Sequence, residues 1–181
     1  MIHTNIIQAD ESHAAAIATI GKKSFRDAFE HFFNHRVELF DYLTYTYNPL
    51  KLVKSLKKEN NIYLLAYRNG KPAGFVKIKK HSLNDQIESG AQMELQKIYV
   101  LTEHQGSGLG TALMKEAKLI TRQFGPDYLW LDTHVSNDGA RRFYERHGFE
   151  TLGTYYFTIG SQSFENYFMA LPIAVKVPHA H

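Results

Sequence analysis

The sequence predicts an α/β (α+β) fold with a mixed central β-sheet and helices on both faces of that sheet. The chain has 181 residues, the length of one domain, and its 44% apolar and 22% charged residues are the balance of a globular protein. β-forming segments alternate with segments of helical spacing, with hairpins early and late and an α/β crossover between them. We expect the order β-α-α-β-β-β-α-β-α-β-β in a single domain at 1–172, followed by a C-terminal tail at 173–181.

The N-terminal segment predicts a short strand at Ile2–Gln8 and then two helices. Asp10 offers a side-chain oxygen that can cap the first helix. Its apolar residues follow at helical spacing: Ala14, Ile17, Ala18 and Phe25. Asn48 followed by Pro49 is typical of a second helix start. The apolar face expected for this helix consists of Leu50, Val53 and Leu56.

Three strands are expected in the middle of the chain. Ile62–Arg68 and Lys71–Lys80 flank Asn69-Gly70, a favoured two-residue hairpin turn. The polar segment His81–Gln92 is expected to be a loop, and Met93–Val100 forms the next strand. A side-chain period of two places four residues of that strand on one face: Glu94, Gln96, Ile98 and Val100.

A glycine-rich segment, Gln105–Gly110, follows this strand and opens a helix that runs to about Phe124. The buried stripe expected for this helix is Leu109, Ala112, Leu113, Ala117 and Ile120. The remaining elements are a strand at Tyr128–His134, a helix at Asp138–His147 ended by Gly148, and two strands at Phe149–Phe157 and Phe164–Leu171 that turn near Gly160-Ser161.

Composition excludes several kinds of site. The chain has no cysteine, which excludes disulfides, thiol nucleophiles and cysteine-ligated zinc. Its net charge is +3 with scattered Lys and Arg, so we expect no nucleic-acid partner. No apolar run is long enough to cross a bilayer and no export signal is visible, which predicts a cytoplasmic protein without a membrane partner. His31 and His35 lack the Glu of H-E-x-x-H, so no metal site is expected.

The glycine-rich segment lies between a strand and a helix, where backbone N–H groups gather at the positive end of a helix dipole. This junction suits a phosphate or pyrophosphate, although a flexible loop at a helix start has the same composition. The P-loop pattern is absent, because no Gly-Lys pair follows these glycines. The spacing G-x-G-x-G also differs from the dinucleotide fingerprint G-x-G-x-x-G, so NAD is a poor fit although Asp132 lies about 20 residues further on.

Two motifs together resemble the GNAT superfamily of N-acetyltransferases. The first is Gln105-x-x-Gly108-x-Gly110, and the second runs from Asn137 through Tyr144 to Gly148-Phe149. The resemblance implies a GNAT fold, acetyl-CoA as cosubstrate, and a small-molecule amine as acceptor, and it leaves a homodimer open. The residues that it implies for cofactor binding are Ile98, Tyr99, Val100, Gln105, Gly106, Ser107, Gly108, Leu109, Gly110, Thr111, Asn137 and Tyr144.

The same resemblance implies two catalytic residues and direct transfer without a covalent enzyme intermediate. Tyr144 would protonate the departing thiolate, and Glu94 would take the proton that the acceptor amine loses. Each residue also has a structural alternative: Tyr144 as a core aromatic, Glu94 as a strand carboxylate, and Asn137 as a helix cap. A non-catalytic acyl-CoA-binding sensor is the rival from another class.

A narrower resemblance is to PaiA-type spermidine/spermine N-acetyltransferases. It is carried by Phe25-x-x-x-Phe29, Glu94-Leu95-x-x-Ile98-Tyr99, Trp130-Leu131 and the ending Gly153…Phe157…Gly160…Met169. One departure is His134, where a Trp is expected. The resemblance implies a polyamine acceptor, with a peptide α-amine or lysine as the alternative. Acids and aromatic rings that would hold a polyamine are Asp27, Glu30, Asp41, Tyr42, Tyr45 and Tyr47.

Overall fold

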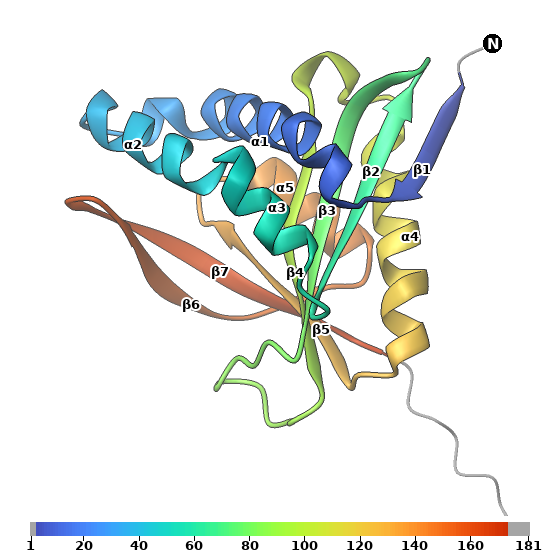
Figure 1. Cartoon of the computed structure of the whole chain (residues 1–181). Helices are drawn as coiled ribbons and strands as arrows, with labels where there is room; N and C mark the ends of the chain where they lie inside the picture. Colours follow the sequence, from blue (N-terminus) through green and yellow to red (C-terminus); the bar gives the residue numbers. More distant parts are fainter. Residues whose placement is uncertain (1–2, 174–181) are drawn as a thin grey trace, which may run out of the picture.

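A mixed seven-stranded sheet in the order β1-β2-β3-β4-β5-β7-β6 forms the centre of the structure, a computed structural model that describes residues 3–173 (Figure 1). Its strands are β1 (Thr4–Gln8), β2 (Asn61–Arg68), β3 (Lys71–Lys80), β4 (Gln92–Val100), β5 (Tyr128–His134), β6 (Glu150–Ile159) and β7 (Gln162–Pro172). Neighbouring strands are antiparallel except β4 and β5, which are parallel. The predicted mixed sheet is confirmed. Most of the tail expected at 173–181, and Ile2 of the strand expected at Ile2–Gln8, lie outside the described residues.

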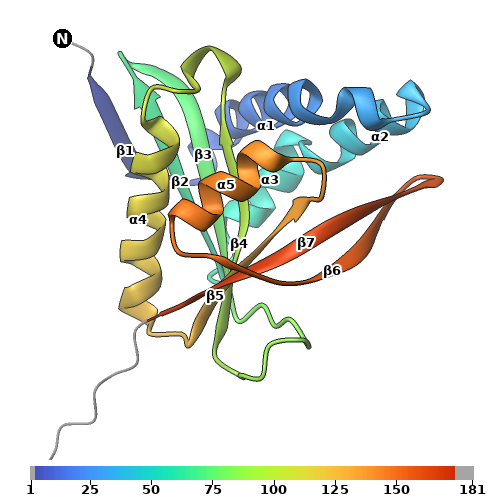
Figure 2. The same cartoon turned by 180° about the vertical axis from the view of Figure 1, so that it is seen from behind.

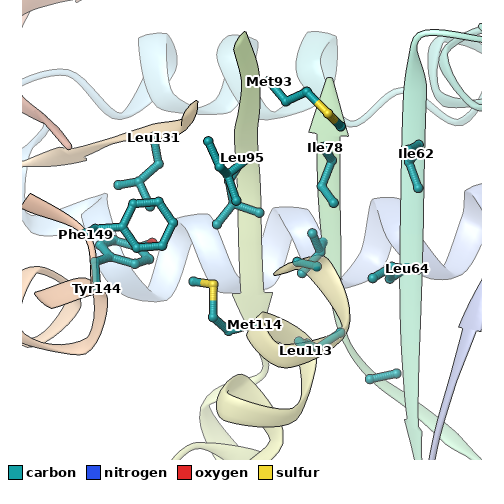
Figure 3. Close-up of a cluster of buried hydrophobic side chains, with 14 of the residues drawn as sticks. Ile62, Leu64, Ile78, Met93, Leu95, Leu113, Met114, Leu131, Tyr144 and Phe149 are labelled. Carbon is teal, nitrogen blue, oxygen red and sulfur yellow. The ribbon is translucent and has the colours of Figure 1, made fainter. Parts of the chain in front are cut away.

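Helices cover both faces of the sheet, as the sequence predicts (Figures 1 and 2). One face carries α1 (Ala14–Phe29), α2 (Arg36–Thr46) and α3 (Pro49–Leu56), and the other carries α4 (Leu109–Phe124) and α5 (Asp138–Arg146). Each layer has its own apolar core: α4 and α5 pack on one cluster (Figure 3), and α1 to α3 pack on a second. The sheet is therefore buried on both sides over its central strands.

The expected order contains two helices before the first hairpin, and the structure contains three. The additional helix is α2. Its apolar residues do not gather in one stripe, because Leu39 and Leu43 are buried whereas Val37, Phe40 and Tyr45 are exposed. A helix without one apolar face has no clear period of 3.6 residues, which is the signal that sequence reasoning depends on.

The expected start of α3 is confirmed, and of its expected apolar face Val53 and Leu56 pack against the core whereas Leu50 does not. Asn48 Oδ1 accepts hydrogen bonds from the backbone N–H groups of Leu50 (2.9 Å) and Lys51 (3.3 Å). Leu50 is 74% exposed, whereas Leu52 is 5% exposed and packs with the core beneath α1 to α3. Leu52 and Leu56 are one turn apart, so they share the inner face that a start at Pro49 presents to the sheet.

The hairpin turn predicted at Asn69-Gly70 and the helix cap predicted at Asp10 are both present in the structure. Asn69 and Gly70 have φ of 48° and 77°, the two positive values that a tight hairpin turn requires. Asp10 Oδ1 accepts the backbone N–H of Ser12 at 2.9 Å and caps a short 3₁₀ turn that leads into α1.

The buried stripe of α4 differs in part from the expected one. Ala112 and Ile120 are only partly buried, and Met114 and Thr121 complete the stripe.

Candidate functional site

The parallel strands β4 and β5 separate soon after their pairing begins. They pair only from Gln92–Tyr128 to Glu94–Trp130, whereas β5 continues to His134 against β7. A cavity of about 1500 Å³ passes through the resulting opening and is lined by the later residues of both strands. The opening leaves the β5-facing edge of β4 unpaired beyond Glu94. Backbone N–H and C=O groups on that edge are therefore available to a ligand.

The glycine-rich loop lies at one end of this cavity and forms the N-terminus of α4. Gly106 and Gly108 have φ of 71° and 83°, backbone conformations that side chains other than glycine adopt only with strain. A Cβ on either glycine would meet nothing within 4 Å, so the loop has open space around it. No side chain caps the 16-residue helix α4. Its first backbone N–H groups are therefore free to bind an anion.

Most of the predicted cofactor residues come together in the cavity. Those that line it, with Glu94, are Ile98, Tyr99, Val100, Gln105, Gly106, Gly108, Gly110, Thr111, Asn137 and Tyr144. Ser107 and Leu109 do not line it. Ser107 Oγ donates a hydrogen bond to the carbonyl of His104, and Leu109 is buried in the core beneath α4. Asn137 Oδ1 accepts the backbone N–H of Ala140 at 3.1 Å, so this residue caps α5 as the structural alternative predicts.

A β-bulge in β4 corrects the expected side-chain pattern of that strand. Ile78 faces Leu95 and Lys77 faces Lys97 across the β3–β4 pair, so Gln96 is an additional residue on β4. The bulge reverses the alternation, so Glu94 no longer shares a face with Ile98 and Val100. The face toward α4 carries Met93, Leu95, Ile98 and Val100, whereas the opposite face carries Glu94, Lys97 and Tyr99.

Tyr144 combines the two roles that the sequence analysis set against each other. It packs with Phe149 at 6.0 Å between ring centroids, beside Leu131 (Figure 3), and it also lines the cavity. Burial, and secondly the charge of Asp132, raise the pKa of Tyr144 well above its ordinary value. The phenol is therefore protonated at neutral pH and can donate its proton to a group in the cavity.

Glu94 is held by a loop residue that sequence reasoning did not identify. Ser82 Oγ donates a hydrogen bond to Glu94 Oε2 at 2.7 Å, and the indole N–H of Trp130 donates to the carbonyl of Ser82 at 2.9 Å. The expected loop between β3 and β4 thus orients the carboxylate at the point where β4 and β5 separate. No sequence motif indicates these contacts, because they join positions far apart in the chain.

Several further charged residues in the cavity were not predicted as site residues. Those on the sheet are Asp132 on β5, Lys77 on β3 and Lys97 on β4. Tyr155 Oη donates a hydrogen bond to Asp132 Oδ2, and burial raises the pKa of Asp132 despite this bond. Burial lowers the pKa of Lys97, although Asp132 and Glu94 oppose that shift. A strict period of two along β4 does not predict that Lys97 shares a face with Glu94, because the bulge at Gln96 changes the alternation.

His134 forms part of an aromatic wall of the cavity, where a Trp was expected. Its ring lies 4.6 Å from Phe32, 6.0 Å from Phe164 and 6.4 Å from Phe29, measured between centroids. Burial, and secondly His31, lower the pKa of His134, which favours the neutral ring. The residues of this wall come from α1, the turn that follows it, β5 and β7.

The residues expected to hold a polyamine are only partly in the cavity. Asp27, Glu30 and Tyr42 line it, whereas Asp41, Tyr45 and Tyr47 do not. Asp27 Oδ2 already accepts hydrogen bonds from Lys23 Nζ and Thr102 Oγ1, both at 3.0 Å. The two remaining rings have other surroundings: the ring of Tyr45 is exposed beneath Lys51, and that of Tyr47 is fully buried.

Residues 3–173 contain neither a candidate metal cluster nor a helix that could span a membrane. No cluster of three or more His, Cys, Asp or Glu suited to a metal ion occurs among them. None of the helices in this part of the chain is both long and apolar enough to span a membrane.

Comparison with known families and sequences finds acetyltransferases. The family model described as "Acetyltransferase (GNAT) family" matches residues 20–149. An uncharacterized N-acetyltransferase of Lactobacillus delbrueckii subsp. lactis is 24% identical over 160 residues, which cover 88% of this chain and 92% of that protein. An uncharacterized N-acetyltransferase of Methanocaldococcus jannaschii is 34% identical over 95 residues, 52% of this chain and 42% of that protein.

Solved structures with the same fold cover almost the whole chain. The PaiA N-acetyltransferase of Thermoplasma acidophilum, solved in complex with coenzyme A, has a TM-score of 0.76 and 18% identity over 94% of this chain and 99% of that chain. The ribosomal-protein-S18-alanine N-acetyltransferase of Escherichia coli has a TM-score of 0.71 and 21% identity, covering 99% of both chains. At these sequence identities, the similarity to the solved structures shows the fold alone.

Proposed function

Since the chain belongs to the GNAT family of acetyltransferases, we propose that it transfers an acetyl group from acetyl-CoA to a primary amine by direct attack. The observation that carries this proposal is the cavity between β4 and β5. It joins the open N-terminus of α4, a protonated Tyr144 and the carboxylate of Glu94 in one space. A phosphate-binding helix start, a proton donor and a proton acceptor are the groups that this reaction needs.

The residues present fit acetyl-CoA. The N–H groups of Gln105–Thr111 would bind the pyrophosphate, and the positive φ of Gly106 and Gly108 leaves the loop open for it. Backbone groups of Ile98 and Val100, on the unpaired edge of β4, would form hydrogen bonds with the pantetheine amides, in the way that a strand edge binds an added strand. The related structure from Thermoplasma acidophilum holds coenzyme A, and one from Salmonella typhimurium holds acetyl-CoA.

Two side chains would move protons during the transfer. When bound, acetyl-CoA supplies the thioester carbonyl that the amine attacks. Glu94 would accept the proton that the ammonium loses, directly or through a water molecule, so that nitrogen can form the new C–N bond. Tyr144, which carries its proton at neutral pH, would donate it to sulfur as the C–S bond breaks. These roles distinguish an enzyme from a non-catalytic acyl-CoA sensor.

The class of amine is the open part of this proposal. The PaiA-like pattern points to a polyamine, but of the residues expected to hold one only Asp27, Glu30 and Tyr42 line the cavity, and Asp27 is already engaged by Lys23 and Thr102. The alternative from the sequence is a peptide α-amine or a lysine side chain. In both cases the amine must reach the space between Glu94 and Tyr144.

An amine panel with acetyl-CoA tests the proposal. The rate is measured from the free thiol of the coenzyme A that the reaction releases. Calorimetry with coenzyme A or NAD shows which of the two the protein binds. We expect coenzyme A to bind, NAD not to bind, and at least one amine to be acetylated. A protein that binds NAD in preference to coenzyme A, or that binds neither, contradicts the proposal. Coenzyme A binding without transfer to any class of amine would instead support the sensor.

A further inference from the structure

Lys77 and Lys97 stand directly opposite each other across β3 and β4, and both line the cavity. The bulge at Gln96 brings Lys97 to the face that Lys77 occupies. Like charges that face each other across a strand pair destabilise a sheet. Such a pair inside a cavity is a site where an anion would be stabilising.

Neither cavity lysine forms an ion pair with the described residues, although the charges of Asp132 and Glu94 act on Lys97 and that of Glu94 acts on Lys77. The ion pairs among residues 3–173 involve His13, Lys23, Lys57 and Arg141. Each ammonium lies near an aromatic ring instead: Lys77 Nζ is 5.7 Å from the Tyr63 ring centroid, and Lys97 Nζ is 5.5 Å from that of Tyr47. A ring face attracts a cation but leaves its net charge uncompensated.

Burial and like charge lower the pKa of both lysines, with Lys97 acting on Lys77 and Lys51 acting on Lys97. Burial, and secondly the charge of Lys97, lower the pKa of Lys77 to about 8. Burial also lowers the pKa of Lys97. Lys51 on α3 lines the same part of the cavity and adds a third cationic side chain.

Negative charge lies in the same cavity, where β4 and β5 separate. Glu94 is oriented by Ser82 near the start of β4, and Asp132 is oriented by Tyr155 on the adjacent strand β5. Asp132 also raises the pKa of Tyr144, which places its carboxylate near the proposed proton donor. The cavity is therefore cationic over β3 and the middle of β4, and anionic where β4 and β5 separate.

We infer that the acceptor amine also carries a carboxylate, which Lys77 and Lys97 bind while the ammonium lies against Glu94 and Asp132. This inference rests on the proposed function and specifies its acceptor. Neighbouring strands are about 4.8 Å apart, so the two charges of the acceptor are separated by several bonds. The chemical class is a small amino acid whose reacting amine is remote from its carboxylate. A polyamine would instead bring a second ammonium toward the lysines.

Matched acceptors that differ only in a carboxylate test the inference. The pairs are 4-aminobutyrate with butylamine, and ornithine with 1,4-diaminobutane, and spermidine is the reference polyamine. We expect kcat/KM to be roughly 10- to 100-fold higher for the carboxylated member, the usual effect of a charge-assisted hydrogen bond. Lys97→Gln and Lys77→Gln should remove that preference. Lys79→Gln should retain it, because Lys79 lies two residues along β3 and does not line the cavity.

A binding measurement tests the same site without turnover. With coenzyme A present to occupy the loop at α4, succinate should raise the thermal unfolding midpoint of the unaltered protein and of Lys79→Gln. It should not raise the midpoint of Lys77→Gln or Lys97→Gln. An equal shift in all four proteins would overturn the inference.

The two levels of the proposal can fail separately. Acetylation of butylamine and 4-aminobutyrate with equal kcat/KM would overturn the carboxylate inference and leave the acetyltransferase proposal intact. Absence of coenzyme A binding and of all turnover would overturn the proposed function. In that event the succinate shift, repeated without coenzyme A, still decides whether the lysines bind a carboxylate.

Discussion

Tyr144 and Glu94, the proposed proton donor and acceptor, come from a helix and a strand, and both line one cavity. Tyr144 enters from α5 with its ring fixed against Phe149. Glu94 enters from β4 with its carboxylate fixed by Ser82. Packing thus orients one group and hydrogen bonding orients the other, which is the preorganisation that proton transfer needs.

Tyr144→Phe removes the proton donor and retains the ring. We expect kcat to fall by roughly 10²–10⁴, the range associated with loss of a general acid. The unfolding midpoint and the affinity for coenzyme A should change little, because the packing against Phe149 remains. Tyr128→Phe is the control, since Tyr128 is on β5 and does not line the cavity. An unchanged kcat would show that Tyr144 is a core aromatic and not the proton donor.

Glu94→Gln retains the shape of the side chain and removes its ability to accept a proton. The rate should fall most at low and neutral pH and recover in part as pH rises, because deprotonated amine then becomes available without a base. The measurement is the pH profile of kcat/KM for the variant and the unaltered protein. A decrease of the same size at every pH would argue for a structural role of the carboxylate.

The cavity lysines predict a pH dependence of stability. The pKa of Lys77 is about 8 in the folded protein against 10.5 when unperturbed. Between these values the unfolded chain binds more protons than the folded protein, so the free energy of unfolding rises with pH. Besides Lys97, the charges that act on Lys77 are Glu94, Lys79 and Lys58.

Denaturant unfolding from pH 8 to 10.5 measures this rise, over the interval set by those two pKa values. Lys77→Gln should show a smaller rise than the unaltered protein, whereas Lys71→Gln, exposed at the start of the same strand, should match the unaltered protein. Identical curves for all three proteins would show that Lys77 has an ordinary pKa.

Sequence reasoning named Tyr144 and Glu94 but missed Lys97 and Asp132 as site residues, for a physical reason. The motifs that carry chemistry here are local, and local patterns identify a loop or a helix residue. The positions of Lys97 and Asp132 depend on a bulge and on the separation of two strands. Neither feature has a sequence period of its own.

At the scale of elements, we propose the N-terminus of α4 as the binding surface for the cosubstrate. Its helix dipole and uncapped N–H groups act together at Gly108, the N-cap residue. A side chain at Gly108 would meet no neighbour within 4 Å, so crowding by protein atoms is not what requires glycine. The requirement is the φ of 83°, which costs other residues about 1–2 kcal/mol.

Gly108→Asp therefore weakens coenzyme A binding chiefly through charge. A carboxylate at the helix start would occupy the anion site and repel the pyrophosphate. Gly108→Ala is the matched control, since it introduces the same backbone strain without charge. Calorimetry should show a much larger loss of affinity for Gly108→Asp than for Gly108→Ala. Equal affinities in the two variants, or affinity like that of the unaltered protein in a folded Gly108→Asp, would place the cosubstrate elsewhere.

Element prediction succeeded where capping and periodicity agree. Asn48-Pro49 starts α3, Asn69-Gly70 turns the first hairpin, and the strand at Tyr128–His134 has its expected bounds. It failed for α2, which is held by neighbours rather than by an apolar face. Glu38 on α2 accepts the backbone N–H of Ser161 at 3.0 Å, a contact 123 residues along the chain. A local pattern cannot show such a partner.

For the whole molecule, the sheet separates two sets of binding elements. α4 and α5 lie on one face with the glycine-rich loop, and α1 to α3 lie on the other with the aromatic wall (Figures 1 and 2). The opening between β4 and β5 connects the two sides. A cosubstrate bound from one side and an acceptor bound from the other can therefore meet only beside Glu94 and Tyr144.

The fold and most residues of the candidate site were predictable from the sequence, whereas the charge distribution of the cavity was not. The order of hairpin, crossover and final hairpin specifies a mixed sheet, and the two motifs identify the family that the comparison confirms. The charge distribution across the cavity follows from residues on β3, β4 and β5 that are far apart in sequence. Only the three-dimensional pairing of these strands brings them together.

The central claim is that acetyl groups pass from coenzyme A to an amine within this one opening. The most direct measurement incubates the protein with acetyl-CoA and 4-aminobutyrate, and quantifies released thiol and acetylated amine in the same sample. We predict equal amounts of both products, with a rate that falls in Tyr144→Phe while coenzyme A binding is retained. Thiol release without acetylated amine from any member of the panel, or full activity in Tyr144→Phe, would contradict the account.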